Sequence, residues 1–355
     1  MIPVASVEYL SSGDGLLAVR AARFAVPGGA TEWHLVLPAG GQGQLGAALA
    51  RWGLSREQLV FVRHFAADPA LLDRGRVGIV QPPLLPSPRA AWAYAIDDGG
   101  PPRTDRAARW FHGLVAPGAG GVAAQTRAVF EQLAAELACD GATLRDQLVR
   151  TWVYVDDIDH HYGAMVEARA ALFAEHGLTV ETHFVASTGI EGRSATPGAA
   201  VQLDALAVVG LDPARQRHLQ APAHLGPTHE YGVTFERGVR VEYGDRAHVW
   251  ISGTASIDPT GRTRHEGDVR AQLARALDNV EALLHDAGAT PADVAQALVY
   301  LRRPDDEPAV RGEVARRLPG VPRLTLLAPV CRPEWLVEIE CLAIVPGDQP
   351  RWPAF

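Results

Sequence analysis

The sequence predicts an α+β fold of tandem units, in which helices pack on one face of a mixed β-sheet. Three observations predict this fold. A helix–Gly–strand pattern recurs along the chain, two strand-like segments 136 residues apart have similar sequences, and proline-rich stretches interrupt the copies. Because an internal repeat marks a repeated structural unit, we expect three units: a partial one at 1–88, a middle one at 89–212 and a C-terminal one at 213–355.

The two clear copies of the repeat are "FEQLAAELACDGATLRDQLVRTWVYVDDID" (130–159) and "LDNVEALLHDAGATPADVAQALVYLRRPDD" (277–306). Each predicts a helix, then Gly-Ala-Thr, a short segment with Asp, a strand with Val-Tyr and an acidic turn. The second helix carries apolar residues at helical spacing, namely Leu277, Val280, Leu283 and Leu284. Gly288 is expected to end this helix in the left-handed conformation.

A fainter copy, "LGAALARWGLSREQLVFVRHFAADPA" (45–70), again predicts helix, Gly, short turn and strand. The proline-rich segments 81–91 and 211–229 are interpreted as the breaks between units. A cluster of acids and histidines at 156–163 matches the acidic turn of the other copy. It therefore predicts a helix start rather than a metal site, and we expect no metal.

The strands that close the units also correspond, "VQLDALAVV" (201–209) with "VEIECLAIV" (337–345). On that register Gln202 matches Glu338 and Asp204 matches Glu340. Glu338 and Glu340 lie two residues apart and so share one face of an apolar strand. Either they pair with arginines across the sheet, or burial raises the pKa of Glu338 and makes it a general acid.

The composition is that of an ordinary soluble protein, with 355 residues, 47% hydrophobic and 21% charged. A formal charge of −8 argues against nucleic acid or an anionic membrane as the main partner. The three cysteines include no C-x-x-C, which favours a reduced protein without structural zinc. Without a basic leader or a long apolar run, we expect a cytoplasmic protein.

The last unit resembles the Rid (YjgF-like) family. The resemblance rests on "HEYGVTFERGVRV", "VWISGTASIDPTGRT", "VPRLTLLAPV" and "VEIECLAIV" between Tyr231 and Pro346. With "RTWVYVDDID" and "ASTGIEGR" in the middle and "VCRPEWLVEIEC" at the end, the chain from about Trp92 to Pro346 is similar to the chorismatases. The resemblance implies Rid-like units in a pseudo-trimeric arrangement, cofactor-free cleavage of chorismate to pyruvate, and a site in a cleft between units.

The resemblance also implies roles for individual residues. Glu338 would be the catalytic acid, with Glu340 as its electrostatic neighbour. Chorismate is a dianion, so arginines should hold its carboxylates. The expected substrate-binding residues are Arg323, Arg150, Tyr154, Tyr231, Gly253, Thr188 and Gly189, with Glu340 beside them. For both arginines, a cross-strand salt bridge is the structural alternative.

Cys331 in "VCRPE" resembles the branch of the family that makes 3-hydroxybenzoate, so it is the second expected catalytic residue. A small buried apolar role is its structural alternative. Three other functions stay open: a hydrolytic chorismatase giving a dihydroxycyclohexadiene carboxylate, a Rid-type enamine/imine deaminase, and a non-catalytic binder of small aromatic acids. Because a pseudo-trimer within one chain has no need to trimerise, we expect a monomer.

Overall fold

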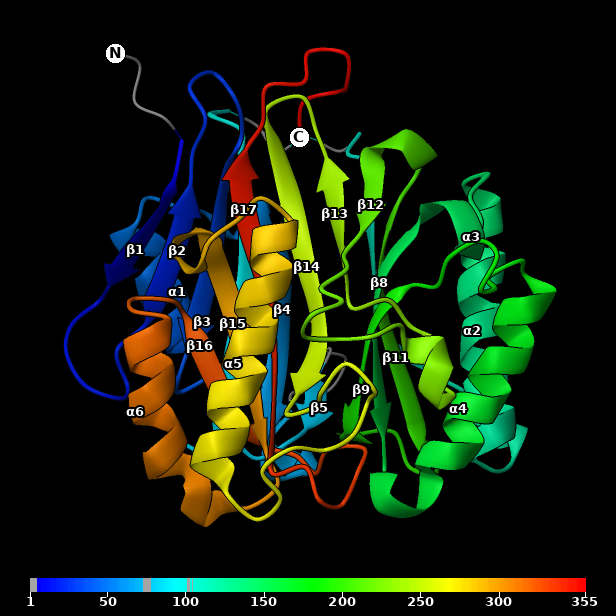
Figure 1. The fold of residues 1–355 in the computed structure, drawn as a ribbon. Helices are drawn as coiled ribbons and strands as arrows, with labels where there is room; N and C mark the ends of the chain where they lie inside the picture. Colours follow the sequence, from blue (N-terminus) through cyan, green and yellow to red (C-terminus); the bar gives the residue numbers. More distant parts are fainter. Residues whose placement is uncertain (1–4, 73–77, 101–102, 104) are drawn as a thin grey trace.

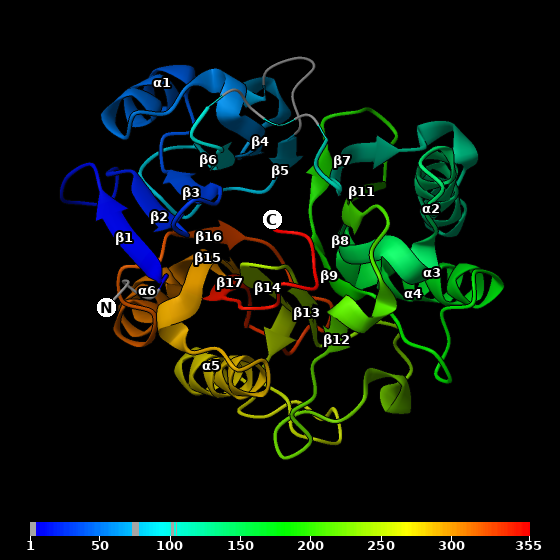
Figure 2. The same cartoon turned by 90° about the horizontal axis from the view of Figure 1, so that it is seen from above.

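The computed structural model describes residues 5–72, 78–100, 103 and 105–355. Three β-sheets surround a common axis, and the helices lie on the outside of this ring of sheets (Figure 1, Figure 2). This arrangement confirms the predicted α+β fold of repeated units with helices on one face of each sheet. In the part of the chain that is described, no helix is long and apolar enough to cross a membrane.

The N-terminal and C-terminal sheets have the same strand order. The N-terminal sheet runs β1 (Val7–Ser11), β2 (Arg20–Phe24), β3 (Thr31–Leu37), β6 (Arg89–Asp97), β4 (Leu59–Ala66) and β5 (Gly78–Val80). The C-terminal sheet runs β12 (Gln216–His218), β13 (Gly238–Glu242), β14 (Arg246–Ala255), β17 (Val337–Pro346), β15 (Val294–Leu301) and β16 (Arg323–Leu327). In both, the last strand pairs in parallel and the others antiparallel, so the sheets are mixed.

The middle sheet keeps the last four positions of this pattern, including the parallel strand. Its order is β7 (Ala108–Val115), β11 (Val201–Val208), β8 (Leu148–Val155) and β9 (Ala186–Glu191), with β9 parallel to β8. Because β6 is a central strand of the first sheet, that sheet extends through Asp97, past the expected boundary at residue 88. The proline-rich segment 81–88 therefore connects β5 to β6 within one sheet instead of separating two units.

The repeated helices pack on the outer face of each sheet. They are α1 (Gln42–Arg51), α2 (Val122–Cys139) and α5 (Val269–Asp286). Each is followed by a glycine with positive φ, at Gly53, Gly141 and Gly288, where the chain turns toward the next strand. A second helix completes the later units, α4 (Ile158–Glu175) in the middle and α6 (Glu307–Arg317) at the end, while α3 (Leu144–Gln147) is a single turn.

The three sheets are joined edge to edge in a closed ring. The short strand β10 (Arg193–Ser194), which follows β9, pairs with β5 of the first sheet. The segment after β5 in turn reaches β16, where Pro83 bridges Leu326. The segment after β16 reaches β9, where Val330 bridges Ile190. Each parallel edge strand is thus covered by the segment that leaves a neighbouring unit.

Buried ion pairs cross the boundaries between the units. In this set Arg63 pairs with Asp204 at 3.0 Å, Arg150 with Glu340 at 2.9 Å and Arg246 with Glu32 at 2.8 Å. All six side chains are almost fully buried. Tryptophans from all three sheets pack between them on the axis, namely Trp92, Trp110, Trp152 and Trp250. The axis is therefore a shared core, and it positions each unit against the next.

Candidate active site

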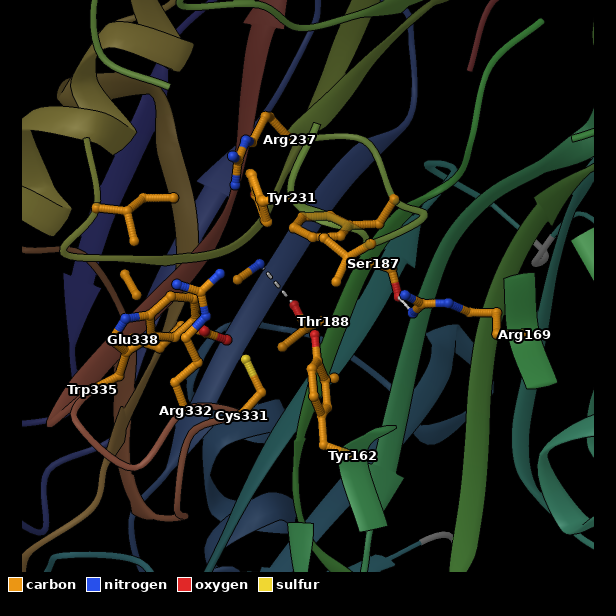
Figure 3. Close-up of a pocket in the computed structure, with 16 residues that line it drawn as sticks. Tyr162, Arg169, Ser187, Thr188, Tyr231, Arg237, Cys331, Arg332, Trp335 and Glu338 are labelled. Carbon is orange, nitrogen blue, oxygen red and sulfur yellow. Dashed lines mark hydrogen bonds between the residues drawn. The ribbon is translucent and has the colours of Figure 1, made fainter. Parts of the chain in front are cut away.

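A pocket of about 260 Å³ lies in the cleft between the middle and C-terminal units (Figure 3). Edge strand β9 contributes Ser187, Thr188 and Gly189 to its wall. The C-terminal unit contributes Tyr231, Gly253, Glu338 and the loop that carries Cys331 and Arg332. Six residues expected from the sequence therefore meet here: Glu338, Cys331, Tyr231, Gly253, Thr188 and Gly189.

Glu338 lies near the start of β17 and points into this pocket (Figure 3). Its neighbours in the sheet are Ala255 on β14 and Tyr300 on β15, so little water reaches the carboxyl from behind. Burial, and next the charge of Glu340, raises the pKa of Glu338 to about 8. At neutral pH this carboxyl is mainly protonated and can donate a proton to a ligand.

Gly253 is required by the position of that carboxyl. A Cβ built at residue 253 would collide with Oε1 of Glu338, and it would also press against the Thr188 methyl. Opposite it, Oγ1 of Thr188 accepts a hydrogen bond from the Gly253 amide at 2.9 Å. The glycine thus lets the acid lie flat against β14 while β9 of the next unit closes the cleft.

Three arginines line the pocket: Arg169 on α4, Arg237 next to β13, and Arg332 beside Cys331. None of them takes part in an ion pair among the residues that the structure describes. Arg237 donates to the Gly226 carbonyl at 3.0 Å, and Arg332 donates to that of Gly261 at 2.8 Å. Cationic groups without a counter-charge favour an anionic ligand.

Arg169 is the most buried of the three, with 2% of the residue exposed. Among the described residues its guanidinium makes a long contact to Oγ of Ser187 at 3.5 Å, and its Nε has no partner there. Burial lowers the pKa of Arg169 and of Arg237, because each charge lies in a poorly solvated place. A carboxylate in the pocket would offset this cost for both.

Cys331 lies in the loop between β16 and β17, facing Tyr162 of α4 (Figure 3). Burial, followed by the charge of Glu338, raises the pKa of its thiol to about 12. The sulfur is therefore a neutral thiol at neutral pH and a poor nucleophile. Its place beside the acid suits a role in shaping the pocket and excluding water.

The remaining expected residues do not line this pocket. Arg150 and Glu340 form the ion pair between β8 and β17, and Trp152 Nε1 donates to the same carboxylate at 2.7 Å. Tyr154 is fully buried in the axial core. For Arg150, the cross-strand salt bridge named as the structural alternative is what the structure contains. Arg150 and Glu340 still contact Thr188, so they support the wall of the pocket.

Arg323 lies elsewhere. It lines a different cavity, between the C-terminal and N-terminal units, with Arg20 and Arg311. The sequence-based hypothesis that Arg323 holds a carboxylate beside Glu338 therefore does not fit the structure, because β16 faces the first unit and β9 faces the acid. The cations beside Glu338 are Arg169, Arg237 and Arg332.

Arg169 and Tyr162 were missed by sequence reasoning, although one signal was available. Arg169 falls among Met165, Leu172 and Phe173, the buried stripe of α4. An arginine within an apolar helical stripe indicates either a buried ion pair or a binding site. Arg237 is not part of an apolar stripe. It follows a glutamate near the start of a strand, a position at which the sequence predicts an exposed residue.

Together these groups can bind a small dianion and protonate it. A neutral carboxyl faces a cavity with three arginines, and Trp335 stacks under Arg332 with its ring centroid 4.7 Å away. Acid catalysis on an anionic substrate is the chemistry that this geometry supports.

Comparisons with known proteins agree with this picture. Residues 237–345 match the sequence model of the Endoribonuclease L-PSP family. The chain is 30% identical over 219 residues to the 3-hydroxybenzoate synthase of Streptomyces hygroscopicus, covering 54% of this chain and 62% of that protein. It is 30% identical over 216 residues to a chorismatase of the same organism, covering 54% and 60%. The matches thus span less than two thirds of these relatives.

Among solved structures, a crystal structure of a chorismatase superposes on the chain with a TM-score of 0.63. The match covers 81% of this chain and 93% of the other. Because the identity is 23%, the match shows similarity of fold alone. In sequence and in fold the chain is similar to chorismatases, which confirms the resemblance predicted from its motifs.

Proposed function

We propose that the chain is a chorismatase that cleaves the enolpyruvyl ether of chorismate to pyruvate and 3-hydroxybenzoate. The observation that carries the proposal is the protonated carboxyl of Glu338, facing a cavity with three arginines that have no carboxylate partner in the described part of the chain. The 30% identity to a 3-hydroxybenzoate synthase supports the same reaction. The steps of the proposed mechanism are proton transfers and C–O bond changes, and none of them needs a redox group or a metal.

In this mechanism Glu338 delivers its proton to the terminal methylene carbon of the enolpyruvyl group, which creates an oxocarbenium-like centre. The ring hydroxyl then attacks the neighbouring carbon, the ether C–O bond breaks, and pyruvate leaves as the ketone. The arene-oxide-like ring opens and loses a proton to become 3-hydroxybenzoate, and that proton restores Glu338. The atoms of chorismate are all contained in the two products.

The arginines hold the substrate for this step. We assign Arg169 of the middle unit to one side of the pocket, and Arg237 and Arg332 of the C-terminal unit, which both contact the ring of Tyr231, to the other, so that each side can meet a carboxylate. A bidentate guanidinium–carboxylate pair fixes orientation as well as charge. The same cations stabilise the charge of the dianion in the pocket.

Cys331 is proposed to influence which product forms. A thiol beside the ring occupies space that a hydrolytic water would need, which favours internal displacement by the ring hydroxyl over hydrolysis. If water attacked instead, the products would be a dihydroxycyclohexadiene carboxylate and pyruvate. The similarity to a protein named chorismatase is compatible with this hydrolytic reaction too, so the test below distinguishes the two products.

The test is incubation of the purified chain with chorismate, followed by chromatographic separation of the products and an enzymatic count of pyruvate. Equal amounts of pyruvate and 3-hydroxybenzoate are expected. A dihydrodiol product identifies the hydrolytic reaction. Unreacted chorismate, together with ammonia release from an enamine or imine substrate, would replace the proposal by a deaminase, and binding without reaction would leave a binder of aromatic acids.

A further inference from the structure

A β-hairpin at residues 257–263 lies against the two arginines that the C-terminal unit contributes to the pocket. The hairpin is closed by an antiparallel bridge between Ile257 and Thr263. Within its turn, the Asp258 carboxylate accepts hydrogen bonds from the Thr260 amide at 2.9 Å and from the Thr260 hydroxyl at 2.7 Å. Only Ile257 of this hairpin lines the pocket, so its other side chains have no part in the proposed reaction.

The hairpin holds Arg332 in two ways. The guanidinium of Arg332 donates a hydrogen bond to the Gly261 carbonyl at 2.8 Å, and it also lies over the ring of Trp335, 4.7 Å from the centroid. Nε1 of Trp335 donates in turn to Oγ1 of Thr263 at 2.8 Å, and this hydroxyl donates to the Glu334 carboxylate at 2.9 Å. Thr263 therefore fixes the indole ring on which Arg332 rests.

The hairpin also supports Arg237, through a second backbone carbonyl. Arg237 donates to the Gly226 carbonyl from Nε at 3.3 Å and from Nη2 at 3.0 Å. Gly226 packs directly on the hairpin, because a Cβ at this residue would collide with the carbonyl oxygen of Pro259. The orientation of the Arg237 guanidinium is therefore set by a carbonyl whose own position depends on the hairpin.

The ring of Tyr231 links the two arginines to the hairpin (Figure 3). The guanidinium carbon of Arg237 lies 5.3 Å from the ring centroid, and that of Arg332 lies 5.6 Å from it. The same ring packs on Gly261, where a Cβ would collide with it. Burial, and further the charge of Arg332, lowers the pKa of Arg237, so the two cations are close enough to repel each other. An anion held by both would offset this repulsion.

The backbone of the loop that carries Arg332 is anchored by other groups. Arg302 donates to the Arg332 carbonyl and to the Trp335 carbonyl, both at 3.2 Å. The side chain of Gln272 on α5 accepts a hydrogen bond from the amide that follows Trp335, at 2.8 Å. Because none of these bonds involves Thr263, loss of its hydroxyl should change the orientation of the Trp335 and Arg332 side chains and leave the loop in place.

We propose that the hairpin at 257–263 orients Arg237 and Arg332 so that they hold one carboxylate of the substrate together, and that Thr263 is a positioning residue for this pair. The inference rests on the proposed function for the identity of the substrate. An arginine has five N–H donors, so the bonds to the carbonyls of Gly226 and Gly261 leave donors for a ligand. A pair that is oriented in advance loses less conformational freedom when the carboxylate binds.

The experiment compares Thr263→Val, which removes the hydroxyl, with Thr263→Ser, which keeps it. KM and kcat for chorismate are measured by pyruvate release. NMR titration gives the affinities for 3-hydroxybenzoate and for pyruvate, two probes that each carry one of the carboxylates of chorismate.

We expect Thr263→Val to raise KM, and to weaken the binding of one probe, by about 3-fold to 10-fold, the effect of one lost hydrogen bond. The value of kcat should stay within about two-fold of the parent, since Glu338 lies outside the hairpin. Thr263→Ser should behave as the parent does.

Trp335→Phe keeps a ring under Arg332 and lacks the Nε1–H donor, so it should reproduce the effect of Thr263→Val. The double variant should lose no more affinity than either single variant, because the two residues act through one hydrogen bond. Trp335→Phe also tests the proposal independently if Thr263→Val folds poorly.

Thr143→Val is the matched control, because it removes a hydroxyl that bonds Asp146 at the start of α3, outside the pocket. This variant should keep the parental KM and both affinities, even where thermal unfolding shows a lower melting temperature.

Parental affinities and KM in Thr263→Val, equal losses in Thr263→Ser, or a fall in kcat with unchanged KM would each overturn the proposal. So would a parent that binds neither probe. A parent that does not turn over chorismate, yet binds a probe with the expected dependence on Thr263, refutes the proposed reaction and supports the role of the hairpin.

Discussion

In the proposed reaction Glu338 supplies the proton, because a buried strand holds its carboxyl in the neutral form. Glu338→Gln keeps the shape and removes the transferable proton, so pyruvate release from chorismate should fall by roughly 10² or more. In the parent, kcat/KM should decline as the pH rises through about 8, where the acid ionises. Pyruvate release near the parental rate in the variant would show that another group supplies the proton.

The same pKa has a consequence for stability. The folded-state pKa of Glu338, about 8, lies above its ordinary value of 4.5, so the folded state binds more protons than the unfolded state between these pH values. The free energy of unfolding contributed by Glu338 therefore falls as the pH rises across this window. Urea unfolding at pH 5 and pH 8 should show Glu338→Gln gaining stability relative to the parent at the higher pH.

Gly253 tests the packing of the acid. In Gly253→Ala the new methyl would displace the Glu338 carboxyl, so we expect at least about a 10-fold loss of activity, since misplacement of a catalytic group by an ångström is costly. Gly43→Ala in α1, where a Cβ meets nothing, is the control and should keep full activity. Equal activities of the two variants would mean that the carboxyl can relocate without loss.

Cys331 should govern the product rather than the rate. Cys331→Ala opens space of about the size of one water, which occupies roughly 30 Å³ in the liquid. We expect the product mixture to shift away from 3-hydroxybenzoate while pyruvate release continues. The measurement is the ratio of ring products to pyruvate, with labelled water as tracer. An unchanged ratio without label in the ring would show that the thiol only packs.

At the scale of elements, the sequence predicted the repeat well and the roles of its closing strand only in part. Glu338 and Glu340 do share one face of β17, as period-two alternation requires. The two carboxyls have different partners because of the middle unit. Arg150 and Trp152 of β8 bind Glu340 and not Glu338. No local pattern in β17 carries that information.

The contact between β8 and β17 should contribute to stability. Arg150→Met leaves the buried Glu340 carboxylate without its cation, so we expect a loss of about 3–5 kcal/mol in the free energy of unfolding. Arg150→Met with Glu340→Gln should recover part of the loss, since the amide oxygen can still accept from Trp152. Arg303→Met, which breaks an exposed pair with Asp306, should change stability little. If Arg150→Met and Arg303→Met lost equal free energy of unfolding, the buried pair between Arg150 and Glu340 would stabilise the fold no more than an exposed pair does.

For the whole molecule, the three-unit architecture was predictable from the repeat, but the order of units around the axis was not. Arg323 was expected beside the acid because its segment resembles a binding motif, yet the ring turns β16 toward the first unit and β9 toward Glu338. The arginines that line the pocket beside Glu338 come from both of the units that form the cleft. Such long-range pairing leaves no periodic signal in the sequence.

Closure of the ring also bears on association. The parallel edge strands β5, β16 and β9 each receive a segment from a neighbouring unit of the same chain, so these edges are not free to pair with a second copy. We therefore propose that the protein is a monomer, and light scattering after gel filtration should give a mass near 38.0 kDa. A mass two or three times larger at micromolar concentration would show that copies associate through another surface. In a monomer the complete catalytic cleft belongs to one chain, so specific activity should not change on dilution.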